Sequence, residues 1–414
     1  MISLLKQAKA AKAAALIYQE QSAKVRQDLL LALASALEAD VENILLVNAA
    51  EVKEQAAAGL DPVLQDRLRL TPERMSDLVS GVRQIATLPD LLGQELESRR
   101  LENGLRLKKI RVPLGVVGMI YEARPNVTVD AAALCLKTGN AALLRGSRLA
   151  RRTNHYLVQI IGRVLRGQQL PPQLVQLVAD DSHDSVLKMA RLRGYLDVII
   201  PRGGARLIQT VLENATVPVL ETGVGNCHLF IDQSADPQMA IAIAINGKCS
   251  RPSVCNALET VLIHRQWPKE YVLQLLTALH EAGVTLHIDK TLLDLAPAAV
   301  PATEEDWDHE YLTLELAVKQ AADVDEAIAH INRHGTRHSE SIVTADSEHA
   351  ARFLQQVDAA CVYHNVSTRF SDGFALGLGA EIGISTQKLH ARGPMGQEAL
   401  TSYKYVISGE GQVR

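Results

Sequence analysis

The sequence predicts an α/β protein built on doubly wound parallel sheets. Residues 113–120 (PLGVVGMI) form a continuous apolar run, which is typical of a strand buried on both faces of a parallel sheet. Strand-like runs then alternate with helix-length segments through residue 364, and this alternation indicates βαβ units. The chain has 414 residues, 47% of them hydrophobic, which is enough for two or three such domains.

The first part of the chain has an Ala- and Leu-rich helical pattern, which we interpret as scaffold. Turn residues break this pattern at 59–62, and Thr71 is a predicted N-cap because Pro and Glu follow it. Lys6, Lys9 and Lys12 interrupt the apolar residues of the N-terminus, so it does not read as a signal peptide. No run approaches the roughly 18 apolar residues of a membrane helix, and we expect a cytoplasmic protein.

Composition excludes several classes of function. The net charge is −4, with 43 basic and 47 acidic residues, so nothing attracts the whole chain to nucleic acid. Aromatic residues make up only 4%, which also disfavours surfaces that stack bases. The five cysteines include no CxxC pair, so we expect a reducing compartment, no disulfide framework and no metal site.

A hairpin is predicted within residues 96–112. The stretch LENGLRLKKIRV alternates apolar and charged residues around Asn103-Gly104, a dipeptide that favours a tight hairpin turn. Two interpretations remain open: a local solvent-exposed hairpin, or a hairpin that extends the sheet of a neighbouring copy.

Polar loops follow the predicted strands at 121–126, 145–148 and 201–204. Because ligands of such sheets lie beyond the carboxyl ends of the strands, these loops are candidate binding segments. Arginines crowd the 145–148 loop, and Gly203-Gly204 precedes a predicted helix whose N-terminus would favour an anion. The GxGxxG fingerprint is absent, and arginine near a ribose suits a 2′-phosphate, hence NADP over NAD.

The stretch 246–260 (NGKCSRPSVCNALET) contains two cysteines beside Lys248 and Arg251. Fixed positive charge favours the thiolate, which is the form that attacks carbonyl carbon. Pro252 predicts that the following residues form a turn. From these residues alone, Cys255 is either a nucleophile that needs distant partners or a small buried hydrophobe.

Four stretches resemble the γ-glutamyl phosphate reductases of proline biosynthesis, within the aldehyde dehydrogenase superfamily: 111–147, 251–260, 365–373 and 377–396. The resemblance covers nearly the whole chain. It implies two Rossmann-like αβα domains and a β-hairpin flap for oligomerisation. The implied domains are an NADPH-binding domain at 1–224 with the 96–112 hairpin inserted, a catalytic domain at 225–385 and a C-terminal segment at 386–414.

The resemblance also implies the reaction. L-glutamyl 5-phosphate is reduced with NADPH to L-glutamate 5-semialdehyde plus phosphate, through a thioester on a cysteine. Two alternatives stay open: another acylating aldehyde dehydrogenase that uses coenzyme A, and a non-catalytic oligomeric scaffold. The resemblance further implies a homodimer or homotetramer and functional coupling to glutamate 5-kinase.

The resemblance assigns roles to individual residues. Cys255 is the expected nucleophile, and Asn126 is expected to stabilise the oxyanion. Glu221 lies 34 positions before Cys255. We expect it to be structural or electrostatic rather than a base that activates water, because a reductase must avoid hydrolysis of its thioester. Expected cofactor-binding residues are Arg145, Ser147, Arg148, Arg202, Gly203, Gly204 and Glu310. Lys248 and Arg251 are candidates for the phosphate end of the substrate and Arg369 for its α-carboxylate, although each is alternatively a surface charge or a capping residue. Ser367 and Thr368 are further expected substrate-binding residues.

Overall fold

The computed structural model describes residues 3–296 and 298–414. The chain divides into two compact units. Unit 1 comprises Met1–Thr222, Gly377–Gly383 and Met395–Arg414, and unit 2 comprises Gly223–Leu376 and Ile384–Pro394. The first boundary therefore lies two residues before the expected one, and the expected C-terminal segment 386–414 is shared between the two units.

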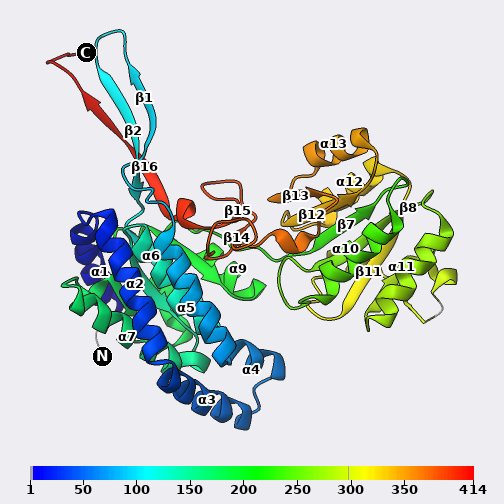
Figure 1. Cartoon of the computed structure of the whole chain (residues 1–414), viewed down its shortest axis with the longest axis horizontal. Coiled ribbons are helices and arrows are strands. Elements are labelled where there is room, and N and C mark those ends of the chain that lie inside the picture. The colour runs from blue at the N-terminus through cyan, green and yellow to red at the C-terminus, as the bar shows by residue number, and fades with distance from the viewer. Residues whose placement is uncertain (1–2, 297) are drawn as a thin grey trace. The chain divides into compact units, whose positions relative to one another are not determined.

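Unit 1 begins with five helices that precede its parallel sheet (Figure 1). The prediction that Thr71 is an N-cap is confirmed at α5: its hydroxyl accepts the Arg74 N–H at 3.2 Å, and Pro72 follows. The helices of unit 1 are α1 (Leu4–Tyr18), α2 (Ala23–Ala39), α3 (Val41–Ala57), α4 (Pro62–Leu68), α5 (Pro72–Thr87), α6 (Asn126–Lys137), α7 (Arg151–Gly167), α8 (His183–Ala190) and α9 (Ala205–Asn214).

The unit 1 sheet has four parallel strands in the order β5-β4-β3-β6: β5 (Val175–Leu177), β4 (Ala141–Arg145), β3 (Val116–Tyr121) and β6 (Val198–Arg202). Every residue of β3 is buried, as the apolar run at 113–120 predicts. Beside β6, residues 217–220 form no strand, and only a single bridge is present there, between Ile199 and Val219. The neighbouring Pro218 has no N–H with which to extend the ladder.

The predicted hairpin is confirmed. β1 (Glu95–Arg100) and β2 (Arg106–Pro113) pair antiparallel, and Gly104 adopts a φ of +87° in the turn between them. The C-terminal strand β16 (Thr401–Ser408) pairs with the other edge of β2, which completes a three-stranded sheet (Figure 1).

Unit 2 contains a seven-stranded parallel sheet in the order β10-β9-β11-β8-β7-β12-β13. Its strands are β7 (Cys227–Ile231), β8 (Leu258–His264), β9 (Thr285–Ile288), β10 (Val300–Pro301), β11 (Glu315–Ala321), β12 (Ser339–Val343) and β13 (Cys361–His364), with a separate pair β14 (Ile384–Ser385) and β15 (Gly393–Pro394). Its helices are α10 (Pro237–Cys249), α11 (Lys269–Glu281), α12 (Val324–His334) and α13 (Ser347–Gln356).

Helices cover both faces of the unit 2 sheet. Leu229 and Ile231 of β7 belong to a buried cluster that includes residues of α10 and α11. Phe230, between them in sequence, belongs to a second buried cluster with residues of α12 and α13. Since successive strand residues point to opposite faces, this division makes unit 2 a three-layer αβα structure. Within residues 3–296 and 298–414, the protein has no helix with the length and apolar character needed to cross a membrane.

Candidate active site

Cys255 lies at the amino ends of the unit 2 strands, in the turn that joins α10 to β8. Its side chain is half-buried. The turn at 252–256 agrees with the prediction from Pro252. Gly225, just before β7, packs directly on this turn, because a Cβ on Gly225 would overlap the carbonyl oxygen of Cys255. Only a glycine therefore lets the two backbone segments approach this closely.

Two side chains fix the backbone around Cys255. Glu310 Oε1 accepts the Gly225 N–H at 2.7 Å, which ties the segment before β11 to the segment that touches Cys255. The Cys227 thiol donates to the Cys255 carbonyl oxygen at 3.2 Å. Burial raises the pKa of Cys227 well above its ordinary value, so this thiol stays protonated and remains a donor. The nucleophile candidate therefore sits on a backbone that is held from two neighbouring strands.

Positive charge gathers beside Cys255. Arg369, in a short helical turn after β13, donates from Nε to Ser250 Oγ at 3.0 Å. Burial and the nearby Arg251 lower the pKa of Arg369, while Asp372 and Cys255 oppose that shift. The two guanidinium groups thus lie near each other and near the thiol, in a setting that suits an anionic acyl substrate.

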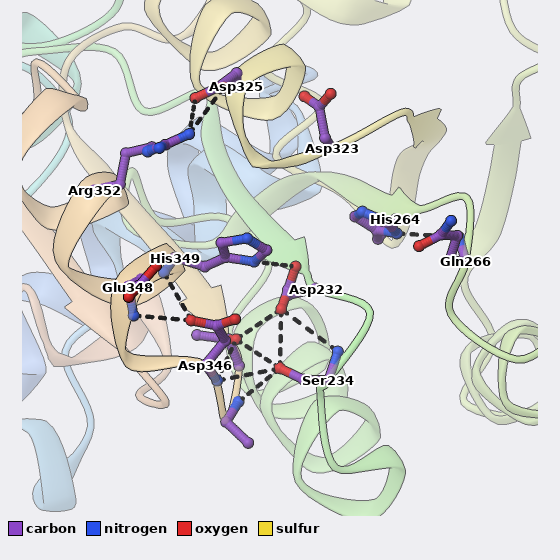
Figure 2. A network of polar contacts seen from close by, with 12 residues as sticks. Asp232, Ser234, His264, Gln266, Asp323, Asp325, Asp346, Glu348, His349 and Arg352 are labelled. Atoms are coloured by element: carbon purple, nitrogen blue, oxygen red, sulfur yellow. Dashed lines mark hydrogen bonds and ion pairs between the residues drawn. The ribbon is translucent and has the colours of Figure 1, made fainter.

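The opposite end of this sheet is closed by a polar network (Figure 2). Asp232, which follows β7, is fully buried and accepts hydrogen bonds from Ser234 Oγ at 2.9 Å, Thr344 Oγ1 at 2.8 Å and His349 Nδ1 at 3.0 Å. Its carboxylate is satisfied by the protein itself and offers nothing to a ligand. In unit 2 the candidate nucleophile Cys255 thus lies at the amino ends of the strands, whereas open α/β sheets commonly bind ligands at the carboxyl ends.

Unit 1 gathers its predicted cofactor residues at the carboxyl ends of three adjacent strands. In the sheet register, Arg145 of β4 pairs with Ile120, and Arg202 of β6 pairs with Tyr121. Arg145 donates from Nε to Ser185 Oγ at 3.1 Å and from a terminal nitrogen to two backbone carbonyls, so it also fixes the loop before α8.

The two other residues of the predicted 145–148 group differ in exposure. Ser147 Oγ accepts the Leu149 N–H at 3.2 Å and begins a short helical turn. The Arg148 side chain is exposed. Arg148 therefore has more freedom than Arg145 to meet a ligand.

The start of α9 holds an anionic group of the protein itself. Gly204 is the N-cap, and its N–H donates to Glu122 Oε2 at 2.9 Å. A Cβ on Gly203 would meet the Glu122 carboxyl carbon at 2.7 Å. The glycine pair therefore accommodates a carboxylate at a helix N-terminus, and phosphate binding there stays a prediction.

Asn126, the expected oxyanion residue, is the first residue of α6. Its Nδ2 donates to Asp130 Oδ2 at 3.1 Å, one helical turn further on. Burial raises the pKa of Asp130 to about 6. The amide of Asn126 is therefore oriented by its own helix.

Comparison with known proteins identifies the family. The model of the aldehyde dehydrogenase family matches residues 4–309 and 298–380. Over all 414 residues the chain is 54% identical to the gamma-glutamyl phosphate reductase of Anoxybacillus flavithermus, with 100% of both sequences covered. The chain belongs to the γ-glutamyl phosphate reductases.

Solved structures agree with this family. The crystal structure of gamma-glutamyl phosphate reductase from Thermotoga maritima is 43% identical, covers 100% of both chains and superposes with a TM-score of 0.96. An engineered glycolyl-CoA reductase with bound NADP+ is 16% identical, covers 97% of this chain and 95% of its own, and gives a TM-score of 0.69, which shows a common fold. The expected aldehyde dehydrogenase fold is thereby confirmed, and the chain is an oxidoreductase of this family.

For this family member, the structure assigns three expected substrate ligands to other contacts. Lys248 is fully buried, and its Nζ lies 2.6 Å from Glu259 Oε2, so the ammonium faces a carboxylate of the protein and not solvent. Ser367 and Thr368 are also buried. The Ser367 hydroxyl accepts the Arg369 N–H, and the Thr368 hydroxyl donates to the Asn256 carbonyl at 2.8 Å. All three side chains therefore have hydrogen-bond or ion-pair partners within the protein, and direct substrate contact by them stays a prediction.

Three residues that contact the Cys255 turn or the Arg369 loop were not predicted from the sequence: Gly225, Cys227 and Asn256. Gly225 could have been identified from the sequence, because Gly223 and Gly225 lie just before an apolar strand, and glycines in such a position indicate that another backbone approaches closely. Cys227 and Asn256 had none, because their partners lie 28 and 113 residues away along the chain.

Proposed function

We propose that this chain reduces L-glutamyl 5-phosphate to L-glutamate 5-semialdehyde with NADPH and releases phosphate, the second step of proline biosynthesis from glutamate. The observation that carries the proposal is the half-buried Cys255, held by Gly225 and flanked by Arg369 and Arg251. Membership of the γ-glutamyl phosphate reductases supports the substrate.

Cys255 acts as the nucleophile. Its thiolate attacks the acyl carbon, phosphate leaves with the electrons of the acyl–oxygen bond, and a thioester forms on Cys255. Phosphate is a good leaving group, so no general acid is required. The Cys255 backbone N–H and the Asn126 amide are the proposed oxyanion donors, and one such donor contributes about 3–4 kcal/mol to lowering the barrier.

The thioester is then reduced. NADPH, when bound, supplies a hydride to the thioester carbon. The resulting hemithioacetal on Cys255 collapses to the aldehyde, and the thiolate is regenerated for the next turnover. Arg369 binds the α-carboxylate through a bidentate contact, and Arg251 attracts the phosphate end of the substrate.

The residues of unit 1 fit a dinucleotide phosphate. Gly203 and Gly204 already accommodate the Glu122 carboxylate at the start of α9, and a pyrophosphate oxygen presents similar acceptors there. Arg202, Ser147 and Arg148 are the further proposed phosphate contacts, with Arg145 near the ribose. Glu310, which is hydrogen-bonded to Gly225 beside Cys255, is the proposed partner of the nicotinamide ribose.

The proposal includes a homo-oligomer formed through the three-stranded sheet. Its strand β16 carries exposed Tyr403, Tyr405 and Ile407, which are 50%, 52% and 56% exposed. Exposed apolar side chains on a narrow sheet are a common means of association between copies.

A purified-protein assay in the reverse direction tests the reaction. Glutamate 5-semialdehyde should reduce NADP+ only when inorganic phosphate is present. Coenzyme A should not replace phosphate, and if it does, the chain is instead an acylating dehydrogenase that uses coenzyme A. Cys255→Ser should abolish turnover, while Cys249→Ser is the matched control, because Cys249 packs against the core cluster. Full turnover by Cys255→Ser would refute the mechanism.

A further inference from the structure

Asn256, the residue after Cys255, joins the nucleophile turn to the loop that carries Arg369. It is 4% exposed, and its Nδ2 donates to the Ser371 carbonyl at 2.8 Å and to the Arg369 carbonyl at 3.3 Å. Its own carbonyl accepts the Thr368 hydroxyl at 2.8 Å. Asn256 is thus hydrogen-bonded to Thr368, to Arg369 and to Ser371, which lie before, at and after the arginine in the sequence.

The loop is anchored on its other side at Ser371. Ser371 is fully buried, and its hydroxyl is hydrogen-bonded to the Tyr363 hydroxyl at 2.9 Å and to Ser339 Oγ at the start of β12. Asn256 therefore connects the nucleophile turn to a point that is itself fixed to the sheet.

Arg369 depends on this connection for its position. Its side chain donates to Ser250, before Cys255 in the chain, while its backbone carbonyl accepts from Asn256, directly after Cys255. The next residue, Phe370, is 50% exposed, so packing alone holds this segment weakly. The bonds from Asn256 therefore set where the guanidinium lies relative to the thiol.

We propose that Asn256 is a positioning residue that gives Cys255 its selectivity for carboxylate-bearing substrates by fixing Arg369. The inference rests on the proposed function, in which Arg369 binds the α-carboxylate. It goes further by naming the residue on which that contact depends. Misplacement of a binding group by about 1 Å can cost on the order of a hundredfold in rate, so such a residue has a measurable effect.

Alkylation of Cys255 tests the inference without any turnover. The Cys255 thiolate attacks the CH2 carbon of iodoacetate or iodoacetamide and displaces iodide, and the two reagents differ mainly in charge. The ratio of their two rate constants therefore cancels any change in the fraction of thiolate, and it reports positive charge near the thiol. Peptide mass spectrometry identifies Cys255 as the modified residue.

Arg369→Gln should lower the iodoacetate-to-iodoacetamide ratio about tenfold, as expected for one charge lost within a Debye length. Asn256→Leu, which keeps the approximate shape of the side chain but removes the amide, should lower it about threefold to fivefold by the same reasoning. Thr368→Val breaks the same connection from the other side and should act in the same direction. It carries the test if Asn256→Leu does not fold.

A double-mutant comparison separates this role from general damage. In the Arg369→Gln background, Asn256→Leu should change the ratio no further, because the charge it positions is already absent. Asn332→Leu is the matched control, since the Asn332 amide also bonds the backbone of a distant segment, at Gln356 and Asp358, but that segment does not adjoin Cys255. It should leave the ratio unchanged.

A folded Asn256→Leu protein with the wild-type alkylation ratio would overturn the inference. It would also be overturned if Asn256→Leu lowered the ratio as much in the Arg369→Gln variant as in the wild type. In turnover assays, Asn256→Leu should raise KM for glutamate 5-semialdehyde more than it lowers kcat, whereas general damage would lower kcat. Alkylation needs no substrate, so the two proposals can fail separately. If the proposed reaction fails but the alkylation ratios are as expected, the positioning role of Asn256 still holds. If the reaction occurs but the ratios are not as expected, only the positioning role is refuted.

Discussion

The buried ion pair between Lys248 and Glu259 allows a quantitative test. Both side chains are fully buried, with Nζ 2.6 Å from Oε2, and the second carboxylate oxygen accepts the Leu312 N–H at 3.3 Å. Lys248→Met removes the ammonium but keeps most of the side-chain volume, which leaves a carboxylate buried with one backbone donor. Breaking a buried pair in this way typically costs about 3–5 kcal/mol of unfolding free energy.

The sign of the pH dependence follows from Glu259. Burial raises its pKa to about 7, although Lys248 opposes that shift. Without Lys248 the pKa should rise further, so the folded variant binds a proton that the unfolded chain releases above its ordinary pKa of 4.5. Stability should then fall as pH rises through this window, by up to about 1.4 kcal/mol per pH unit. The loss in Lys248→Met should be larger near pH 8 than near pH 6.

Urea unfolding followed by tryptophan fluorescence measures this effect in unit 2 alone. The chain has two tryptophans, Trp267 and Trp307, and both are buried in unit 2. Combining Lys248→Met with Glu259→Leu should restore most of the stability, because no buried charge remains. A Lys248→Met protein with wild-type stability at both pH values and a raised KM for phosphate would refute this reasoning and return Lys248 to the substrate site.

Three further outcomes are expected. Gly225→Ala should lower turnover about a hundredfold or more, because the new methyl group displaces the Cys255 carbonyl, while the circular dichroism of the helices stays unchanged. Glu122→Gln should tighten NADPH binding about twofold to fivefold in a fluorescence titration, since it removes an anion that competes for the Gly204 N–H, and weaker binding would contradict this. Asp232→Asn should destabilise unit 2 by about 1–3 kcal/mol in neutral urea titrations. Burial alone would raise the pKa of Asp232, but hydrogen bonds from Thr344, Ser234 and His349 lower it, so this loss should shrink as pH falls through the lowered pKa of the folded state.

Local patterns in the sequence predicted the elements that frame the site. The apolar run at 113–120, the Asn103-Gly104 hairpin and the turn after Pro252 are all present, because each depends on residues that are neighbours in the chain. The turn that carries Cys255 could therefore be predicted from the sequence.

The contacts that cross the fold could not be predicted. The sequence around Lys248 shows a cation beside a cysteine, but its burial depends on how α10 packs against β8, which carries Glu259. Arg145 likewise ends a predicted strand, yet its hydrogen bonds reach the loop before α8 and Ser185 in the first turn of that helix. Side-chain partners of this kind follow from tertiary packing, and periodicity contains no information about them.

Cys255 follows the C-terminal end of α10, and this position has a consequence for its chemistry. Cys255 therefore lacks the support that a helix N-terminus gives to a reactive cysteine. The partly exposed Arg369 and the exposed Arg251 then supply the positive charge near the thiolate, and dissolved ions weaken its effect. The reactivity of this thiol should therefore decline as ionic strength increases, which makes the salt content of the surroundings a control on the rate at which the acyl group is captured.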